Sequence, residues 1–310
     1  MNTSEAIALT RLNVKPSESG AVPIRPSLSL RVPSVIEAGD LAGMNKRDDI
    51  LIVDLRSSDR RVGEYIPGAV LLPYENLVRS DGKAEGLEPE IESLLAVLSA
   101  IGLRDESWVI AYDDDNGTRA SRLLWLLNAI GHRTYSLLNG GFSAWRDGNY
   151  PLVAESAEPQ STDYYAAYKP EAFADRAYVR RNLNNPDVIL LDARSAPEFD
   201  GSDIRATRGG HIPGAINFEW SLAVDVADYG RLREPAVIAR QLRERGITPD
   251  REIVVYCQTH HRSSLSFIAL KHAGYTRVRA YPGSWSEWGN RRDTPIAIAE
   301  EAVPQLAVAS

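Results

Sequence analysis

The residues best able to do chemistry stand together in one short segment. Cys257 is the only cysteine of the chain, and Gln-Thr-His-His-Arg follows it at 258–262. The thiolate is the form of cysteine that attacks, and a free thiol has a pKa of about 8.5, so reaction near neutral pH needs help from positive charge. A helix N-terminus, the N–H groups of a strand-to-helix loop and adjacent cations supply that help. A lone cysteine is more often a buried structural residue. Because Cys257 follows an apolar strand pattern and begins a polar loop, we predict a reactive nucleophile.

The counts of cysteine and histidine exclude several other chemistries. One cysteine in 310 residues cannot form an internal disulfide, a four-cysteine zinc site or a four-thiolate iron–sulfur cluster. The histidines show neither an HExxH motif nor paired spacing supported by carboxylates, and no glycine-rich phosphate loop is present. We therefore predict no metal site and no cofactor.

Composition and charge indicate the setting. With 44% hydrophobic and 25% charged residues, the chain can bury a sizeable core. The net charge of −7 argues against a protein that coats nucleic acid. The first residues lack the basic and then apolar pattern of a secretion signal, and no stretch reaches about 18 uncharged apolar residues. We expect a cytoplasmic protein that binds neither nucleic acid nor a membrane.

An internal repeat divides the chain into two halves. Four blocks recur in the same order: ILIVDLRS at 50–57 and VILLDARS at 188–195, YIPGAV at 65–70 and HIPGAI at 211–216, WVIAYD at 108–113 and EIVVYC at 252–257, and the segments 129–145 and 272–288, which both end in tryptophan. Ordered recurrence of this kind indicates a tandem duplication.

Within each half, strand patterns alternate with helical ones. Short runs rich in β-branched and aromatic residues predict strands at 50–54, 69–72, 108–112 and 134–138, and again at 188–191, 215–217, 253–256 and 277–281. Apolar residues at helical spacing predict helices at 90–101, 119–130, 235–246 and 263–273. Alternating strands and helices predict an α/β fold in which each half is a parallel sheet flanked by helices, with any site at the carboxyl ends of the strands.

The same patterns predict the domain boundaries. We expect a flexible proline-rich arm at 1–33, a non-catalytic N-terminal domain at 34–151, a linker at 152–172, a catalytic C-terminal domain at 173–298 and a tail at 299–310.

Residues that both halves share are expected to be scaffold. Asp54 and Arg56 match Asp192 and Arg194 at the ends of two strands, and we predict that each Asp-x-Arg is an ion pair that positions loops. Further shared positions are the Ile-Pro-Gly turns at 66–68 and 212–214 and two tryptophans predicted in the core, Trp145 and Trp288.

The halves differ most where a strand meets the next helix. The first half has Asp-Asp-Asp-Asn-Gly-Thr-Arg at 113–119, and the second has Cys-Gln-Thr-His-His-Arg-Ser at 257–263. Adjacent carboxylates would repel an anionic substrate. This difference predicts that only the second half is catalytic and that the first covers one side of the reactive loop.

The repeated blocks and the single reactive-type cysteine resemble the rhodanese family of thiosulfate sulfurtransferases, most closely its bacterial two-domain members, over about residues 34–298. The resemblance implies two rhodanese-like domains. It also implies that Cys257 takes the outer sulfur of thiosulfate as a persulfide and passes it to cyanide or another thiophilic acceptor. Its partners would be a small-molecule sulfur donor and acceptor, with a thiol protein as a further acceptor.

By the same resemblance, the substrate-binding residues would be those of the loop. Arg262 would hold the sulfonate oxygens with its planar fork, and His260 and His261 would add charge when protonated, although adjacent residues do not readily point the same way. Gln258 and Thr259 complete this set. Glu198 stands where vertebrate-type members have a substrate-binding arginine, so the charge has to come chiefly from His260, His261 and Arg262.

Three alternatives stay open. Mercaptopyruvate sulfurtransferases carry a small, uncharged, glycine-rich loop, which this loop does not match. Cysteine-dependent phosphatases need five residues between cysteine and arginine, whereas four separate Cys257 from Arg262. A persulfide carrier without fast turnover would need only the single thiol.

Overall fold

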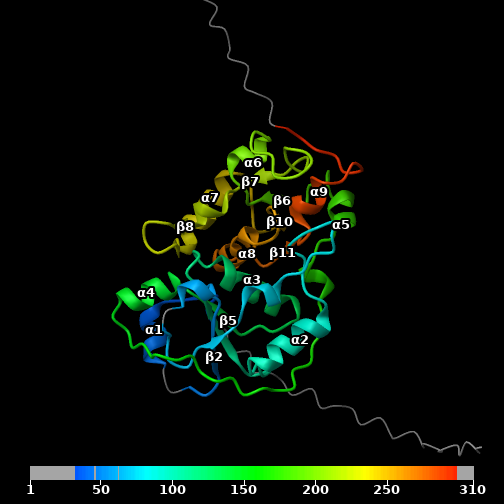
Figure 1. Ribbon diagram of the computed structural model, residues 1–310. Coiled ribbons are helices and arrows are strands. Elements are labelled where there is room, and N and C mark those ends of the chain that lie inside the picture. The colour runs from blue at the N-terminus through cyan, green and yellow to red at the C-terminus, as the bar shows by residue number, and fades with distance from the viewer. Residues whose placement is uncertain (1–31, 45–46, 62, 299–310) are drawn as a thin grey trace, which may run out of the picture. The chain divides into compact units, whose positions relative to one another are not determined.

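The computed structural model describes residues 32–44, 47–61 and 63–298 (Figure 1). The described residues belong to one compact unit. Most of the predicted arm at 1–33 and all of the predicted tail at 299–310 lie outside the described residues.

The first half contains a five-stranded sheet with the order β1-β5-β4-β2-β3, in which every pair is parallel. Its strands are β1 (Val35–Ile36), β2 (Ile50–Asp54), β3 (Val70–Leu71), β4 (Trp108–Tyr112) and β5 (Tyr135–Leu138). Its α-helices are α1 (Ala38–Gly43), α2 (Ile91–Ala100), α3 (Thr118–Ala129) and α4 (Gly141–Asp147), and it has 3-10 turns at Ser58–Arg60 and Tyr74–Leu77.

The second half repeats this topology with the order β11-β10-β6-β7, again all parallel. An isolated parallel bridge from Phe173 to Ala280 takes the place that β1 has in the first half. The strands are β6 (Val188–Asp192), β7 (Ile216–Asn217), β10 (Glu252–Tyr256) and β11 (Val278–Ala280), with a separate antiparallel pair, β8 (Val224–Asp225) and β9 (Arg231–Leu232). The helices are α5 (Arg176–Arg181), α6 (Ala196–Asp200), α7 (Pro235–Glu244), α8 (Arg262–His272) and α9 (Ser284–Trp288), with 3-10 turns at Pro170–Ala172 and Trp220–Ala223.

The predicted α/β class with two parallel sheets is therefore confirmed, and every predicted strand and helix is present within a few residues of its expected bounds. Between α4 and the 3-10 turn at Pro170–Ala172, where the linker was expected, the chain has no helix and only an isolated bridge from Val153 to Tyr65. None of the helices in the described part of the chain could cross a membrane.

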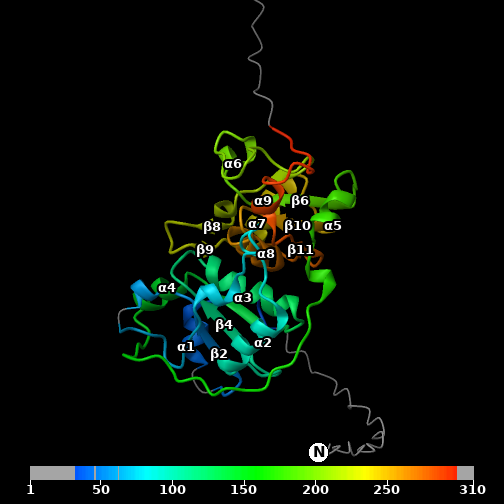
Figure 2. The ribbon, with the colours of Figure 1, turned by 45° about the vertical axis from the view of Figure 1, so that its right-hand side comes forward.

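Helices α3 and α8 lie side by side between the two sheets (Figures 1 and 2). Every residue of α3 except Arg119 is buried, because one side of the helix faces its own sheet and the other faces the second half. A single hydrophobic cluster runs from Leu123 and Trp125 on α3 to Leu265 and Ile268 on α8. This shared core places the start of α8, and so the loop before it, against the first half.

The two Asp-x-Arg pairs are buried ion pairs, as predicted. The shortest Arg Nη2 to Asp Oδ2 distance is 2.7 Å for Arg56 and Asp54 and 2.6 Å for Arg194 and Asp192, and all four side chains are at most 1% exposed. Each arginine also donates to the carbonyl just before its Ile-Pro-Gly turn, at Glu64 or Gly210. The pairs therefore connect a strand end to the next loop.

We predict that Asp192→Ala lowers the free energy of unfolding by about 3–5 kcal/mol, because it leaves the buried Arg194 guanidinium without its carboxylate. Urea denaturation at pH 7 measures this change. Glu244→Ala is the control, since its pair with Arg240 is more than 60% exposed on both sides, and it should cost at most about 0.5 kcal/mol. Equal losses in the two variants would contradict the assignment.

Candidate active site

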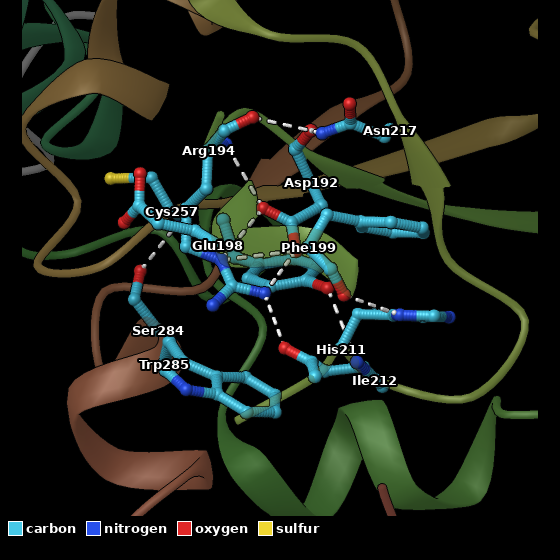
Figure 3. A network of polar contacts seen from close by, with 12 residues as sticks. Asp192, Arg194, Glu198, Phe199, His211, Ile212, Asn217, Cys257, Ser284 and Trp285 are labelled. Atoms are coloured by element: carbon cyan, nitrogen blue, oxygen red, sulfur yellow. Dashed lines mark hydrogen bonds and ion pairs between the residues drawn. The ribbon is translucent and has the colours of Figure 1, made fainter. Parts of the chain in front are cut away.

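Cys257 directly follows β10, and its side chain is fully buried. Its amide donates to Ser284 Oγ at 3.3 Å, and its carbonyl accepts the Trp285 amide at 2.9 Å (Figure 3). The parallel register of β10 with β6 sets Tyr256 opposite Asp192, so the thiol lies near the Asp192–Arg194 pair without being part of it. Backbone contacts on both sides of Cys257 hold the residue in place.

Ser284 is a site residue that the sequence analysis missed. Its φ is +50°, in the left-handed region that costs a non-glycine residue about 1–3 kcal/mol. The matching residue of the first half is Gly141, with φ +56°. A serine kept where the duplicate has glycine points to a use for its hydroxyl, which accepts the Cys257 amide and donates to the Tyr281 carbonyl at 2.9 Å. The difference was visible in the aligned repeats.

The matching loop of the first half binds an anion, the carboxylate of Asp113, with its backbone amides. The Asp113 side chain, at the position of Cys257, is buried and accepts the amides of Asp115, Gly117 and Ala120 at 2.7–2.8 Å. Burial raises the pKa of Asp113, and these three hydrogen bonds act in the opposite direction. The loop therefore forms a nest of N–H groups around the side chain that ends the strand.

The Cys257 loop shares the turn that makes this nest. His260 has φ +52°, and its counterpart Asn116 has φ +55°. Within the described part of the chain, none of the amides of residues 259–263 has a hydrogen-bond acceptor. The second loop thus presents unpaired N–H groups at a helix N-terminus, which is a favourable place for an anion.

Arg262 lies at the start of α8 and has a carboxylate partner, Glu198. Its Nη1 and Nη2 donate to the two carboxylate oxygens of Glu198 at 2.6 and 2.7 Å. Glu198 also closes the capping box of α6 with Ser195. Burial alone would lower the pKa of Arg262, but the hydrogen bonds with Glu198, together with the charges of Cys257 and Glu198, raise it. Arg262 is therefore a fixed cation whose charge Glu198 largely offsets.

His260 points away from solvent and into the first half. It is fully buried, its Nδ1 lies 2.7 Å from Ser263 Oγ, and its ring centroid is 4.4 Å from that of Trp125. Burial lowers the pKa of His260 well below its usual value, and the positive charge of Arg122 adds to this effect. His260 is therefore neutral at physiological pH.

His261 connects the loop to the first half through polar contacts. Its Nδ1 lies 2.7 Å from the Tyr74 hydroxyl, and its Nε2 lies 2.8 Å from Thr118 Oγ1 and 3.3 Å from Asp115 Oδ2. All three partners belong to the first half. The two histidines thus differ in environment, as their adjacency suggested.

Gln258 and Thr259 form the other edge of the loop. Gln258 Nε2 donates to the Arg205 carbonyl at 2.9 Å. A Cβ on Gly86, which has φ +70°, would lie 2.0 Å from the Thr259 carbonyl oxygen, so only glycine fits this contact. A cavity of about 220 Å³ borders the loop here, lined by residues 80 and 82–85 of the first half and by Arg205, Gln258, Ser286 and Asn290 of the second.

Comparisons with known proteins agree with this arrangement. The model of the Rhodanese-like domain matches the chain twice, at residues 37–147 and 175–291. The chain is 41% identical over 267 residues to a thiosulfate sulfurtransferase of Azotobacter vinelandii, covering 86% of this chain and 98% of the relative. A thiosulfate sulfurtransferase of Pseudomonas aeruginosa is 40% identical over the same shares. The protein belongs to the rhodanese family.

A solved structure shares the fold at lower sequence identity. The wild-type structure of EanB superposes with a TM-score of 0.76 at 22% identity, covering 86% of this chain and 69% of that one.

The Glu198–Arg262 pair predicts an acid-dependent stability. Burial alone would raise the pKa of Glu198, but Arg262 and Ser195 lower it to about 2. Because the folded pKa lies below the unfolded value of about 4.3, ionised Glu198 adds stability that is complete above about pH 4.5 and lost as the pH falls towards 2. The loss of unfolding free energy caused by Glu198→Gln should therefore be larger at pH 7 than at pH 3.5. Urea denaturation measures it, and an equal loss at both pH values would be inconsistent with the pairing.

Proposed function

We propose that the protein is a thiosulfate sulfurtransferase that uses Cys257 as its nucleophile. The main support is the contrast between the two strand-to-helix loops. One nest of N–H groups is filled by the carboxylate of Asp113. The matching loop begins at the only thiol, and the amides of its residues 259–263 have no acceptor among the described residues. The match to each of the two thiosulfate sulfurtransferases covers 98% of that relative's length.

The reaction would run in two displacements. The Cys257 thiolate attacks the outer sulfur of thiosulfate, the bond between the two sulfur atoms of the donor breaks, and sulfite leaves with the bonding electron pair. The product is a Cys257 persulfide anion. Cyanide then attacks the terminal sulfur, forms thiocyanate and returns the thiolate, so that ping-pong kinetics are expected.

The residues of the loop have distinct roles in this scheme. The amides of residues 259–263 stabilise the anionic sulfur, as an oxyanion hole stabilises developing negative charge. Arg262 uses two of its N–H groups on Glu198, and the remaining donors of its fork are available for the sulfonate oxygens. Gln258 and Thr259 line the approach, while His260 and His261 hold the loop against the first half.

The surroundings of the loop favour small reactants. Cys257 is fully buried, and the cavity of about 220 Å³ beside Gln258 has room for thiosulfate or cyanide. The charged residues that line it are Lys83, Arg205 and Glu85, and this excess of positive charge suits an anionic donor. A single thiol that must stay reduced fits a reducing, cytoplasmic setting.

Cys257→Ala should abolish thiocyanate production from thiosulfate and cyanide. Treating the wild-type protein with thiosulfate should add the mass of one sulfur atom, and the variant should gain none, because the chain has no other thiol. Intact-mass spectrometry and a thiocyanate assay measure these results. Thiocyanate production retained by Cys257→Ala would show that Cys257 is not the nucleophile.

The same assays separate the alternatives. Faster turnover of 3-mercaptopyruvate than of thiosulfate would favour mercaptopyruvate sulfurtransferase. A stoichiometric burst without turnover would favour a persulfide carrier. Phosphate release from p-nitrophenyl phosphate without thiocyanate formation would favour a cysteine-dependent phosphatase.

Ser284→Ala should lower kcat/KM for thiosulfate by about tenfold, because the Cys257 amide loses its acceptor. Ser284→Gly also loses the hydroxyl but relieves the left-handed backbone. Its activity should therefore be as low as that of the alanine variant while its stability is higher. Steady-state kinetics and thermal unfolding make the comparison. Full activity in both variants would show that the hydroxyl has no role in positioning Cys257.

A further inference from the structure

Arg122 is a buried arginine that α3 of the first half brings to the reactive loop. Its side chain is fully buried and donates to three backbone carbonyls: Nε to Leu77 at 3.1 Å, Nη2 to Leu87 at 2.9 Å, and Nη1 to His260 at 3.4 Å. The last acceptor belongs to the loop that begins at Cys257.

Arg122 differs from the other arginines around the two strand ends. Arg56, Arg194 and Arg262 each have a carboxylate within 2.7 Å. For Arg122, no carboxylate of a described residue lies within ion-pair distance. Burial lowers the pKa of Arg122, but a guanidinium stays protonated in proteins. A buried charge without a counter-ion is costly. An anion that forms nearby during the reaction and balances the positive charge of Arg122 would explain why a buried arginine stands at this position.

Few groups near Arg122 can supply that anion. Burial raises the pKa of Tyr74 to about 12, so its hydroxyl stays neutral at pH 7. Glu88 is within Coulombic range but makes no contact with the guanidinium, and burial raises its pKa. Burial also raises the pKa of Tyr168, so its hydroxyl stays neutral at pH 7. Besides these three groups, the negative charge of Cys257 acts on Arg122. Its thiolate and persulfide are anions formed in the proposed reaction.

The contact with His260 gives Arg122 a second effect, through peptide geometry. The His260 carbonyl accepts hydrogen bonds from Arg122 Nη1 and from Ser264 Oγ, the latter at 2.6 Å. In a planar trans peptide, the carbonyl of one residue and the N–H of the next point in opposite directions. Fixing the His260 carbonyl therefore orients the His261 amide. In the first half the matching amide, that of Gly117, donates to Asp113 Oδ1 at 2.8 Å.

We propose that Arg122 is a positioning residue for the sulfur chemistry of the other half: it orients the His261 amide toward the sulfur of Cys257 and places an unneutralised positive charge near the anionic sulfur. This inference rests on the proposed function of Cys257. It makes the first half part of the active site, where the sequence indicated only a cover.

The thiol pKa of Cys257 reports on this role. The charged or titratable groups that act on the sulfur or on its neighbours come from several elements. They are Arg122 from α3, Tyr74 from the 3-10 turn before α2, Glu88 just before α2, Asp115 from the loop before α3, Tyr168 from the segment before the 3-10 turn at Pro170–Ala172, His260 and His261 from the loop, Arg262 from α8, Glu198 from α6 and Asp192 from β6. Of the arginines in this set, Arg262 is paired with a carboxylate, whereas Arg122 has no carboxylate partner in the described part of the chain. Removing Arg122 should therefore shift the thiol pKa upwards.

The experiment compares Arg122→Gln and Arg122→Lys in the full-length chain, with Arg146→Gln as the control. Arg146 lies on α4 with its side chain 53% exposed, and its replacement makes the same change in net charge. The readouts are the thiol pKa, from the pH dependence of alkylation of Cys257, and the pH profile of kcat/KM for thiosulfate. Unfolding curves establish that each variant is folded.

Arg122→Gln should raise the thiol pKa by about one unit and lower kcat/KM at pH 7 by about tenfold, with the loss shrinking as the pH rises above the new pKa. Arg122→Lys keeps the charge without the fork, so its pKa should lie between those of the wild type and the glutamine variant. The control should match the wild type.

An unchanged thiol pKa in Arg122→Gln, or a loss of activity equal at every pH, would overturn the inference. If the glutamine variant does not fold, an unchanged pKa in Arg122→Lys together with full activity does the same. Failure of the proposed function would look different, because the wild-type protein itself would then form no persulfide.

Discussion

A negatively charged sulfur inside a protein needs N–H groups and positive charge around it, and no free carboxylate beside it. Most features of this site follow from that constraint. Among the described residues, the amides of 259–263 in the loop after β10 have no other acceptor, and α8 begins directly after this loop. Glu198 is held by Arg262 and by the cap of α6. The shared core around α3 and α8 then holds the first half against this loop.

The duplication supplies a comparison within one molecule. Both strand-to-helix loops have a positive φ at the same position, in Asn116 and His260. In the first, the Asp113 side chain provides an internal anion and occupies the nest permanently. In the second, the shorter cysteine side chain leaves the matching amides of Thr259 and His261 without an acceptor among the described residues, while the Ser264 amide donates to the His261 carbonyl at 3.2 Å. A sulfur atom added to the thiol would extend that side chain into the same nest. In the first half, the Asp113 carboxylate thus fills the position that the added sulfur would take in the second half.

The fold and the reactive cysteine could be predicted from the sequence because the two halves of the repeat could be compared position by position. Block alignment separated the Asp-x-Arg scaffold from Cys257, and the apolar periodicities located the strands and helices. The same alignment could also have identified Ser284, because it places this serine opposite Gly141. Arg122 was not, because its role depends on the packing of α3 against α8, and its counterpart Ser266 in the repeat gives no hint of it. The pairing of Arg262 with Glu198 was hidden for a similar reason, since 64 residues separate the two along the chain.

We expect the amides of residues 259–263 to receive the sulfur that Cys257 takes from its donor, and a crystal structure of the protein after thiosulfate treatment measures this. One additional sulfur atom should be bonded to Cys257 Sγ and lie within hydrogen-bond distance of loop amides, including that of His261, in the position that the Asp113 carboxylate occupies in the first half. A persulfide directed away from these amides, or added sulfur elsewhere in the chain with Cys257 unmodified, would contradict it.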